Sequence, residues 1–256
     1  MRTLEFERRV RRGAAQRSAP HPLGEAFFHD ELSRVWVLNQ LSVDAATNVA
    51  GLIGALDELY SHLQHRRAFV EDPHVGERLA PGLRAAGWLV ERDVFMVLRR
   101  DRDRSAEPGL AREVDEATIR AVEAQTIGEE PFGEPAIVEQ LLGSRAAFGR
   151  AGNARYFVAA SDGVDGCHAT LYSDAVVAQI EDVGTLKAMR GRGLARAACS
   201  AALDAAIAAG HELVFIVADD EDWPKELYAK LGFDPVGRPW AFTRPGPEHP
   251  AHKPAT

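Results

Sequence analysis

The chain of 256 residues is 46% hydrophobic and 27% charged, the proportions of an ordinary soluble globular protein with room for one large domain or two small ones. Its net charge of −8 at pH 7 argues against general nucleic-acid binding, which usually requires a basic face. The sequence has two cysteines, no apolar segment of about 18 residues and no secretory signal. We therefore expect a cytoplasmic protein without a disulfide framework or a membrane span.

The first 104 residues predict alternating strands and helices after an arginine-rich start. Residues 1–17 carry several arginines together with Glu5 and Glu7, and we interpret them as a solvated segment. Helical spacing of apolar residues predicts a helix from Asp44, as its N-cap, to Leu63, and a second over 75–86 that Gly87 ends. Short apolar runs predict strands at 26–28, 35–41, 67–71 and 93–98.

A mixed charge run at 99–104, followed by a Pro-Gly pair, predicts a domain boundary. We expect an N-terminal domain over 1–104 and a C-terminal domain over 105–244. The proline-containing residues 245–256 are expected to be a disordered tail. In the second domain the patterns predict helices at 112–126, 134–148 and 223–231, and strands at 154–160, 166–172, 176–183, 211–218 and 240–243.

A basic, glycine-rich loop follows the strand over 176–183 and precedes a long alanine-rich helix. It consists of Arg190, Gly191, Arg192, Gly193, Leu194 and Ala195. Glycines let the backbone approach an anion, and a helix N-terminus offers unpaired N–H groups with partial positive charge. The loop therefore predicts a phosphate site. A dinucleotide site is disfavoured, because Arg196 stands where G-x-G-x-x-G needs its third glycine and no strand-end acid lies about 20 residues further on.

No metal site is expected. The nine histidines are scattered, and although His62 and His65 lie one helical turn apart, no further Cys, His or Glu follows at metal-ligand spacing. Cys199 lies in an alanine-rich apolar stretch, and we interpret it as a small buried residue rather than a nucleophile.

The order of elements in the first half is repeated in the second. From Val35 and again from Val176 the chain is expected to run strand, helix, strand, helix, a Gly-aromatic break and a strand. The first copy has no Arg/Gly loop. We interpret the N-terminal half as a duplicate that has lost its anion loop, with two generic α/β segments as the alternative.

The loop and a second motif together resemble the GNAT superfamily of acetyl-CoA-dependent N-acetyltransferases. The loop matches the family pattern Gln/Arg-x-x-Gly-x-Gly/Ala, and residues 227–233 match Leu-Tyr-x-Lys-x-Gly-Phe at the usual separation. The resemblance covers about residues 110–244, with a weaker version over 25–98. It implies an α/β (α+β) fold: a mixed, mostly antiparallel GNAT-type sheet flanked by helices, with a second, smaller degenerate GNAT-like unit at the N-terminus.

The resemblance also implies roles for individual residues. The backbone of residues 191–195 would bind the pyrophosphate of acetyl-CoA, and Val183 and Thr185 would hydrogen-bond the pantetheine arm like an added strand. Their strand usually bulges and splays from its neighbour. A backbone N–H near Val183 would stabilise the oxyanion, and Tyr228, at the family's acid position, would protonate the leaving thiolate.

The catalytic base is chosen between two neighbouring carboxylates. On strict alternation Glu181 shares a face with Val183 and Thr185, whereas Asp182 lies on the opposite face. We therefore prefer Glu181. A bulge would reverse this choice, and proton removal through a water is equally open.

The expected function is transfer of an acetyl group from acetyl-CoA to a primary amine of a small molecule or peptide, at one active site per chain. Nucleic acid, membrane and metal are not expected as partners, and a homodimer is left open. The rival hypothesis is a noncatalytic acyl-CoA-binding or protein-interaction module. Two departures from the family concern the cofactor: Lys187 replaces a common proline, and no Asn-x-x-Ala precedes the second motif, which removes one CoA contact.

Overall fold

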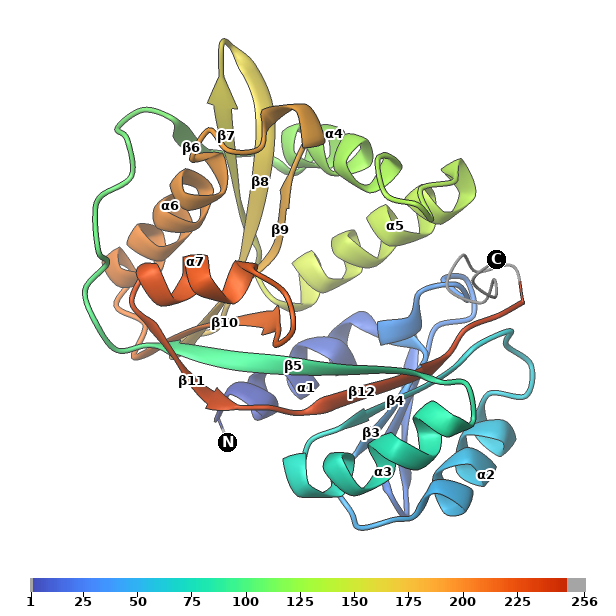
Figure 1. The fold of residues 1–256 in the computed structure, drawn as a ribbon. Coiled ribbons are helices and arrows are strands. Elements are labelled where there is room, and N and C mark those ends of the chain that lie inside the picture. The colour runs from blue at the N-terminus through green and yellow to red at the C-terminus, as the bar shows by residue number, and fades with distance from the viewer. Residues whose placement is uncertain (1, 248–256) are drawn as a thin grey trace.

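Twelve strands form one continuous sheet with helices on both faces (Figure 1). The computed structural model describes residues 2–247, so residues 248–256 of the expected tail lie outside it. This mixed α/β architecture confirms the expected fold class. Within the described residues, no helix combines the length and apolar character needed to cross a membrane.

Each half contributes its own series of elements to this sheet. The N-terminal half contains α1 (Arg2–Ala14), β1 (Arg17–His21), β2 (Gly24–Phe28), the 3₁₀ helix η1 (Trp36–Leu38), β3 (Leu41–Val43), α2 (Val49–Leu59), β4 (Arg66–Val70), α3 (Pro73–Ala85) and β5 (Leu89–Leu98). The C-terminal half contains β6 (Ala111–Val114), α4 (Glu116–Gly128), α5 (Pro135–Ala151), β7 (Arg155–Ser161), β8 (Val164–Ser173), β9 (Val177–Thr185), the 3₁₀ helix η2 (Lys187–Met189), α6 (Leu194–Ala208), β10 (Leu213–Asp219), α7 (Pro224–Lys230), β11 (Phe233–Gly237) and β12 (Trp240–Arg244).

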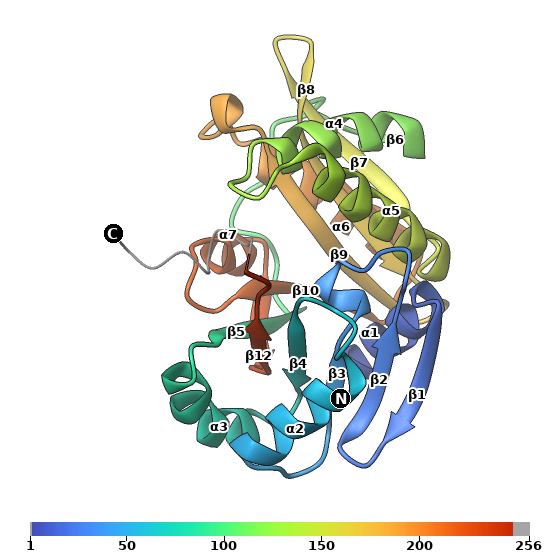
Figure 2. The same cartoon turned by 90° about the vertical axis from the view of Figure 1, so that its right-hand side faces the viewer.

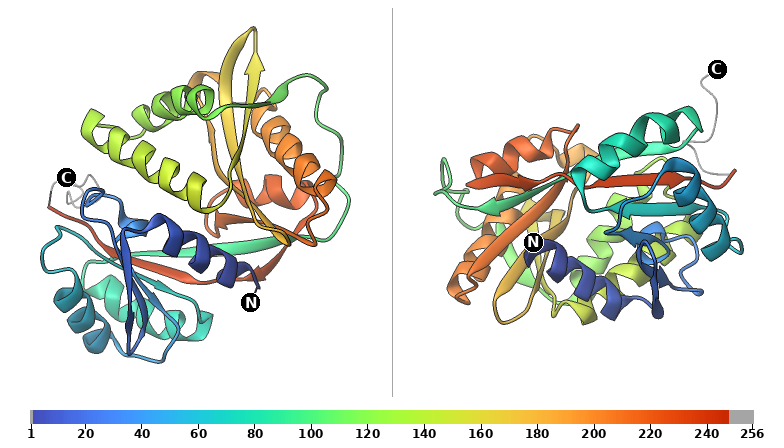
Figure 3. Two further views of the ribbon diagram at one scale, coloured as in Figure 1. Left: turned by 180° about the vertical axis from the view of Figure 1, so that it is seen from behind. Right: turned by 90° about the horizontal axis from the view of Figure 1, so that it is seen from below.

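The two halves exchange strands. Residues 89–92 of β5 pair with β12, which also pairs with β4, so the last strand completes the N-terminal part of the sheet. Residues 93–97 of β5 pair with β10, and β11 pairs with the far edge of β5, so β5 completes the C-terminal part. β5 and β12 run side by side through the junction (Figure 3). The division at residue 104 remains a prediction about folding units, but the sheet crosses it twice.

The N-terminal segment is a packed helix, which corrects the interpretation of residues 1–17 as solvated. Phe6 and Val10, one helical turn apart on α1, are buried. The Phe6 ring packs edge-on against Phe215 of β10, with 5.8 Å between ring centroids. The many arginines around these two residues make the segment look polar in the sequence. Several of these arginines form ion pairs with acidic residues on other elements, as Arg8 does with Glu71 at 2.6 Å.

Several element boundaries differ from the sequence predictions because a side chain supplies a local cap. The run over 35–41 is not one strand but η1 and β3, since the Asn39 side-chain amide donates to two carbonyls of the preceding turn. α2 starts after Asn48, which accepts the Gly51 N–H, and not at Asp44. The segment after 111 begins as β6, and α4 starts only where Asp115 caps it. β11 was not predicted.

Helices cover both faces of the C-terminal part of the sheet. α6 and α7 cover one face, where Ala178 and Ile180 of β9 are buried. α1 and α5 pack on the other face with Val177 and Tyr172, and α4 lies beside α5 (Figure 2). α2 and α3 pack on the N-terminal part of the sheet. The residues that follow Ile180 on β9 therefore lie between two helical layers.

Candidate active site

β9 and β10 are parallel neighbours over only part of their length. Residues 177–180 pair with 213–216, after which β9 continues to Thr185 and β10 to Asp219 without further pairing. The two strands run in different directions beyond this point (Figure 1). The backbone edge of residues 181–185 that faces away from β8 thus has no β10 partner, and an extended ligand can use such an edge as if adding a strand.

A bulge in β9 marks the start of this divergence. Thr170 of β8 pairs with Glu181, but His168 pairs with Gly184, so that Asp182 and Val183 together oppose a single residue. Asp182 has a φ of +53°, which turns the backbone into the left-handed region. A Cβ atom on Gly184 would lie 2.3 Å from His168 Nε2, so only glycine fits at this end of the bulge.

The bulge changes the facing of side chains that strict alternation predicts. The Tyr172 hydroxyl donates to Asp182 Oδ2 at 2.7 Å, and Arg145 Nε of α5 lies 3.4 Å from Asp182 Oδ1. Asp182 therefore shares the α5 side with Glu181, and its predicted place on the opposite face is wrong. Val183 instead packs among residues of the α6 and α7 layer. Glu181 and Asp182 therefore cannot be distinguished as candidate bases by the face of the sheet on which they lie. Their contacts distinguish them.

Glu181 is half-buried and is joined to α1 by one amide. Gln179 Nε2 donates to Glu181 Oε2 at 2.6 Å and also to Glu7 Oε1 at 3.0 Å. Burial raises the pKa of Glu181 well above its usual range, and the carboxylates of Asp182 and Glu7 add to the rise. Within the described chain no Lys or Arg forms an ion pair with Glu181. A carboxylate with a raised pKa is suited to accept a proton near neutral pH.

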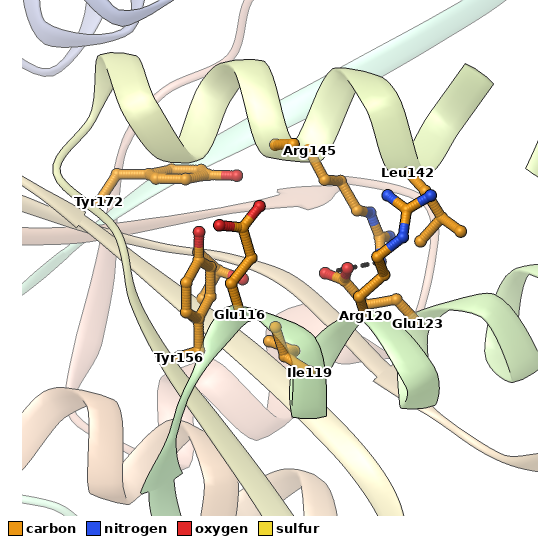
Figure 4. A pocket seen from close by; sticks show the side chains of 10 residues that line it. Glu116, Ile119, Arg120, Glu123, Leu142, Arg145, Tyr156 and Tyr172 are labelled. Carbon is orange, nitrogen blue, oxygen red and sulfur yellow. Dashed lines mark ion pairs between the residues drawn. The ribbon is translucent and has the colours of Figure 1, made fainter. Parts of the chain in front are cut away.

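Asp182, by contrast, belongs to a buried ion network. Arg145 binds both Asp182 and Glu123 of α4, the latter at 3.1 Å. Figure 4 shows Arg145 and Glu123 with Tyr172 around a small cavity of about 10 Å³, which has room for roughly one water molecule. Since both oxygens of Asp182 are used by Tyr172 and Arg145, this carboxylate holds the bulge and α5 together.

Tyr228 of α7 is 6% exposed and lies in the core beneath α6. None of the described residues hydrogen-bonds its hydroxyl. Burial raises the pKa of Tyr228, and the Cys199 thiol and the Glu181 carboxylate raise it further.

The basic loop forms an open turn at the start of α6. Gly191 and Gly193 have φ values of +78° and +77°, and a Cβ atom at either position would meet nothing within 4 Å. These glycines are therefore required for their backbone conformation and not for lack of space. The N–H of Ala197 is the first in α6 to bond back, to the Gly193 carbonyl at 3.0 Å. The N–H groups of residues 194–196 thus have no partner within the helix.

The two arginines of the loop and the lysine before it make different contacts. Arg190 is exposed and reaches the Thr185 carbonyl at 3.3 Å, while Arg192 binds Asp162 at 2.8 Å. The Lys187 N–H donates to a carboxylate oxygen of Glu129 at 2.7 Å, and its ammonium binds the Glu129 carbonyl. Lys187 thereby ties the α4–α5 loop to the start of the basic loop.

Both predicted pantetheine residues, Val183 and Thr185, lie on the stretch of β9 that has no β10 partner. The Thr185 hydroxyl donates to Cys167 Sγ at 3.2 Å, and its carbonyl accepts from Arg190 Nε at 3.3 Å. Cys167 and Cys199 are both buried, and burial raises the pKa of the Cys167 thiol to about 11. In the part of the chain that is described, no group of three or more His, Cys, Asp or Glu residues could hold a metal ion.

Comparison with known proteins identifies the family. Residues 122–233 match the model of the acetyltransferase (GNAT) family. A search of curated proteins finds no match. The GCN5-related N-acetyltransferase from Kribbella flavida superposes with a TM-score of 0.64 at 21% identity, covering 96% of this chain and 95% of that one. Residues 122–233 therefore form a domain of the acetyltransferase (GNAT) family, and this family indicates acyl transfer.

Two further structures share the fold at lower identity. A functionally unknown conserved protein from Staphylococcus epidermidis ATCC 12228 gives a TM-score of 0.69 at 11% identity, covering 89% of this chain and 93% of that one. A tandem GNAT protein from the clavulanic acid biosynthesis pathway gives 0.51 at 18% identity, covering 76% and 68%. These likenesses concern architecture alone.

Sequence reasoning missed the residues that surround the two carboxylates. Glu7 and Gln179 contact Glu181 or its amide partner, and Arg145 and Tyr172 hold Asp182. Gln179 lies two residues before Glu181 and could have been proposed from strand alternation. Nothing in the local pattern pointed to Glu7, which is 172 residues away from Gln179 in the chain.

Proposed function

We propose that the C-terminal half transfers an acetyl group from acetyl-CoA to a primary amine. The observation that carries this proposal is the bulged, unpaired end of β9, which leads directly into a glycine loop at a helix N-terminus. An extended thiol arm and an anionic pyrophosphate need these two features in this order along the chain.

The residues of the loop fit the pyrophosphate of acetyl-CoA. Left-handed Gly191 and Gly193 expose backbone to the ligand, and residues 194–196 offer N–H groups without helical partners. Arg190 and Arg192 add positive charge at the exposed rim of the loop. Val183 and Thr185 would bind the pantetheine amides through their backbone.

Glu181 is the base in this proposal. It removes a proton from the acceptor ammonium, directly or through a water, and the free amine nitrogen then attacks the thioester carbonyl carbon. A backbone N–H near Val183 stabilises the negative charge on the carbonyl oxygen. When the C–S bond breaks, the Tyr228 hydroxyl gives its proton to the thiolate and regains one from the attacking nitrogen, so that the products are an N-acetyl amine and CoA.

Asp182 is assigned a positioning role. Its two oxygens are engaged by Tyr172 and Arg145, and it stabilises the left-handed backbone turn of the bulge. Moving it would move the N–H groups that face the thioester, so its replacement by asparagine should lower kcat more than acetyl-CoA affinity.

Calorimetric titration with acetyl-CoA, followed by thiol detection of free CoA over a panel of amines, tests the function. Binding with amine-dependent CoA release supports the enzyme. Binding without release for any amine supports the rival noncatalytic module. If millimolar acetyl-CoA produces no heat of binding and no thermal shift, the cofactor assignment is refuted.

A further inference from the structure

His168 of β8 lies directly against one end of the bulge in β9. It pairs with Gly184, and its ring occupies the place where a side chain at that position would begin. A Cβ atom on Gly184 would lie 2.3 Å from Nε2 of the ring and 2.9 Å from Cε1. The ring is 1% exposed, so it is closed off from solvent. The backbone at this end of the bulge therefore rests against the imidazole of His168.

Thr126 of α4 holds this ring in place. Its hydroxyl oxygen lies 2.9 Å from His168 Nε2, and the hydroxyl donates to the Glu123 carbonyl at 3.0 Å. Because a hydroxyl has only one proton to donate, Nε2 of the ring is the donor and Thr126 is the acceptor. Nδ1 then has no proton, and it is buried without a partner among the described residues. Thr126 thereby selects one tautomer and one orientation of the ring.

The His168 ring is uncharged as well as fixed. Burial lowers the pKa of His168 well below its ordinary value, and the charge of Arg145 lowers it further. The ring therefore stays neutral at physiological pH. A buried ring that does not titrate in this range is unsuited to transfer a proton in catalysis, so any role of His168 acts through the residues that it contacts.

The same turn of α4 is also linked to the other end of the bulge. Glu123 lies three residues before Thr126, on the same face of the helix, and pairs with Arg145 at 3.1 Å (Figure 4). Arg145 in turn lies 3.4 Å from Asp182. One helical turn is thus connected to both ends of the bulge, through one intermediate side chain at each end.

The depth of the threonine–histidine pair makes its polar character informative. Thr126 and His168 are 9% and 1% exposed, and burying polar groups costs more desolvation than burying apolar side chains of similar size. Apolar residues would fill the same space, but they would not orient the ring, because only a hydrogen bond is directional. What the pair gains is a fixed surface for the backbone of residues 182–184.

Resting on the proposed function, we propose that Thr126 and His168 are positioning residues for catalysis. Through Gly184 they fix the backbone of residues 182–184, so that the N–H near Val183 points to the place where the thioester oxygen becomes negatively charged. Oxyanion donors act when they are aligned in advance, and a displacement of about 1 Å can cost about 100-fold in rate. His168 touches neither the cofactor nor the acceptor in this arrangement.

Thr126→Val tests the pair, because valine keeps the shape of threonine and removes the acceptor. We expect kcat, measured by CoA release with one fixed amine, to fall about 10-fold or more. The KM for the amine and the acetyl-CoA affinity found by calorimetry should change less than about 2-fold, because the cofactor loop is untouched. Thr126→Ser keeps the hydroxyl and should retain most of the original kcat.

Thr3→Val is the matched control. Thr3 is a buried threonine of α1 whose hydroxyl has no partner among the described residues, so the same substitution there should leave kcat unchanged. Thermal melting of each variant shows whether it is folded. If Thr126→Val does not fold, His168→Gln takes its place, because the glutamine amide can still donate to Thr126, whereas His168→Leu cannot. The glutamine variant should then lose less kcat than the leucine variant.

Nitrogen NMR of labelled histidine gives a readout that does not depend on activity. The His168 signal, identified by its absence in His168→Gln, should show a proton on Nε2 and none on Nδ1. Thr126→Val should change this tautomer pattern and Thr126→Ser should preserve it.

Three results would overturn the proposal: an unchanged kcat in Thr126→Val, an equal loss of kcat in Thr126→Ser or in both His168 variants, or a proton on Nδ1 of His168. Failure of the proposed function is a different result. In that case the unmodified protein does not bind acetyl-CoA or releases no CoA with any amine, and the positioning role falls with it.

Discussion

Replacing Glu7 by glutamine is expected to shift the pH dependence of catalysis to lower pH. Glu7 is outside the part of the chain that matches the GNAT family, yet one amide of Gln179 joins it to Glu181. Its negative charge raises the pKa of Glu181. Because a base works when deprotonated, removing this charge lets Glu181 become active at lower pH. Glutamine keeps the size of the side chain and an oxygen that can accept from Gln179.

The distances set the size of the shift. Glu7 Oε1 and Glu181 Oε2 both contact Gln179 Nε2, at 3.0 and 2.6 Å, so they lie within about 5.6 Å of each other. With an effective dielectric constant of about 20 to 40, a unit charge at this separation contributes roughly 1.5–3 kcal/mol, or about 1–2 pKa units. Burial also raises the pKa of Glu7, so the two carboxyls titrate as a pair and the shift applies to their joint behaviour.

The assay is the pH profile of kcat/KM for one fixed amine, so that the ionisation of the amine cancels between variants. The rising limb should move to lower pH by about 1–2 units in Glu7→Gln. Glu5→Gln removes an equal charge from the exposed side of α1 and should leave the profile unchanged. An unmoved limb in Glu7→Gln, or one moved to higher pH, would refute the assignment of Glu181 as a base coupled to α1.

Three further substitutions have defined outcomes. Tyr228→Phe should lower kcat about 10-fold or more, while calorimetry finds acetyl-CoA affinity and thermal stability nearly unchanged, because the hydroxyl has no partner in the described chain. Gly193→Ala should cost about 1 kcal/mol in urea unfolding and weaken acetyl-CoA binding, because alanine is strained at a φ of +77°. Burial raises the pKa of Asp93 to about 7, so the folded state binds its proton more tightly than the unfolded state and loses stability as pH rises from about 4 to 7. Asp93→Asn should therefore melt at the same temperature as the unmodified protein at pH 4 and at a higher temperature at pH 8.

The family and its two motifs could be predicted from the sequence because they depend on neighbours in the chain. The glycines at 191 and 193 need left-handed backbone whatever surrounds them, and the helix that follows supplies free N–H groups by its own geometry. Most helices and strands of the C-terminal half are likewise close to their expected positions, since hydrophobic periodicity is a local property.

The contacts of the Glu181 and Asp182 carboxylates could not be predicted from the sequence. The direction of Asp182 depends on a bulge, in which one extra residue inverts the alternation that a strand pattern assumes. Glu7 reaches Gln179 across 172 residues of chain, and its helix looked solvated because two buried apolar residues are set among arginines.

The sequence by itself determined the GNAT resemblance of the C-terminal half, the place of the glycine loop and the strand that precedes it. The tertiary structure determines which part of the sheet each strand joins. β5 pairs with β10 of the C-terminal half and β12 pairs with β4 of the N-terminal half, and no local sequence pattern predicts these pairings. It also determines that the N-terminal half contacts the candidate site through Glu7, because Gln179 donates to both Glu7 and Glu181. The physical reason is that burial and electrostatic interactions depend on which side chains are neighbours in space, and these neighbours are defined only when distant segments of the chain pack together.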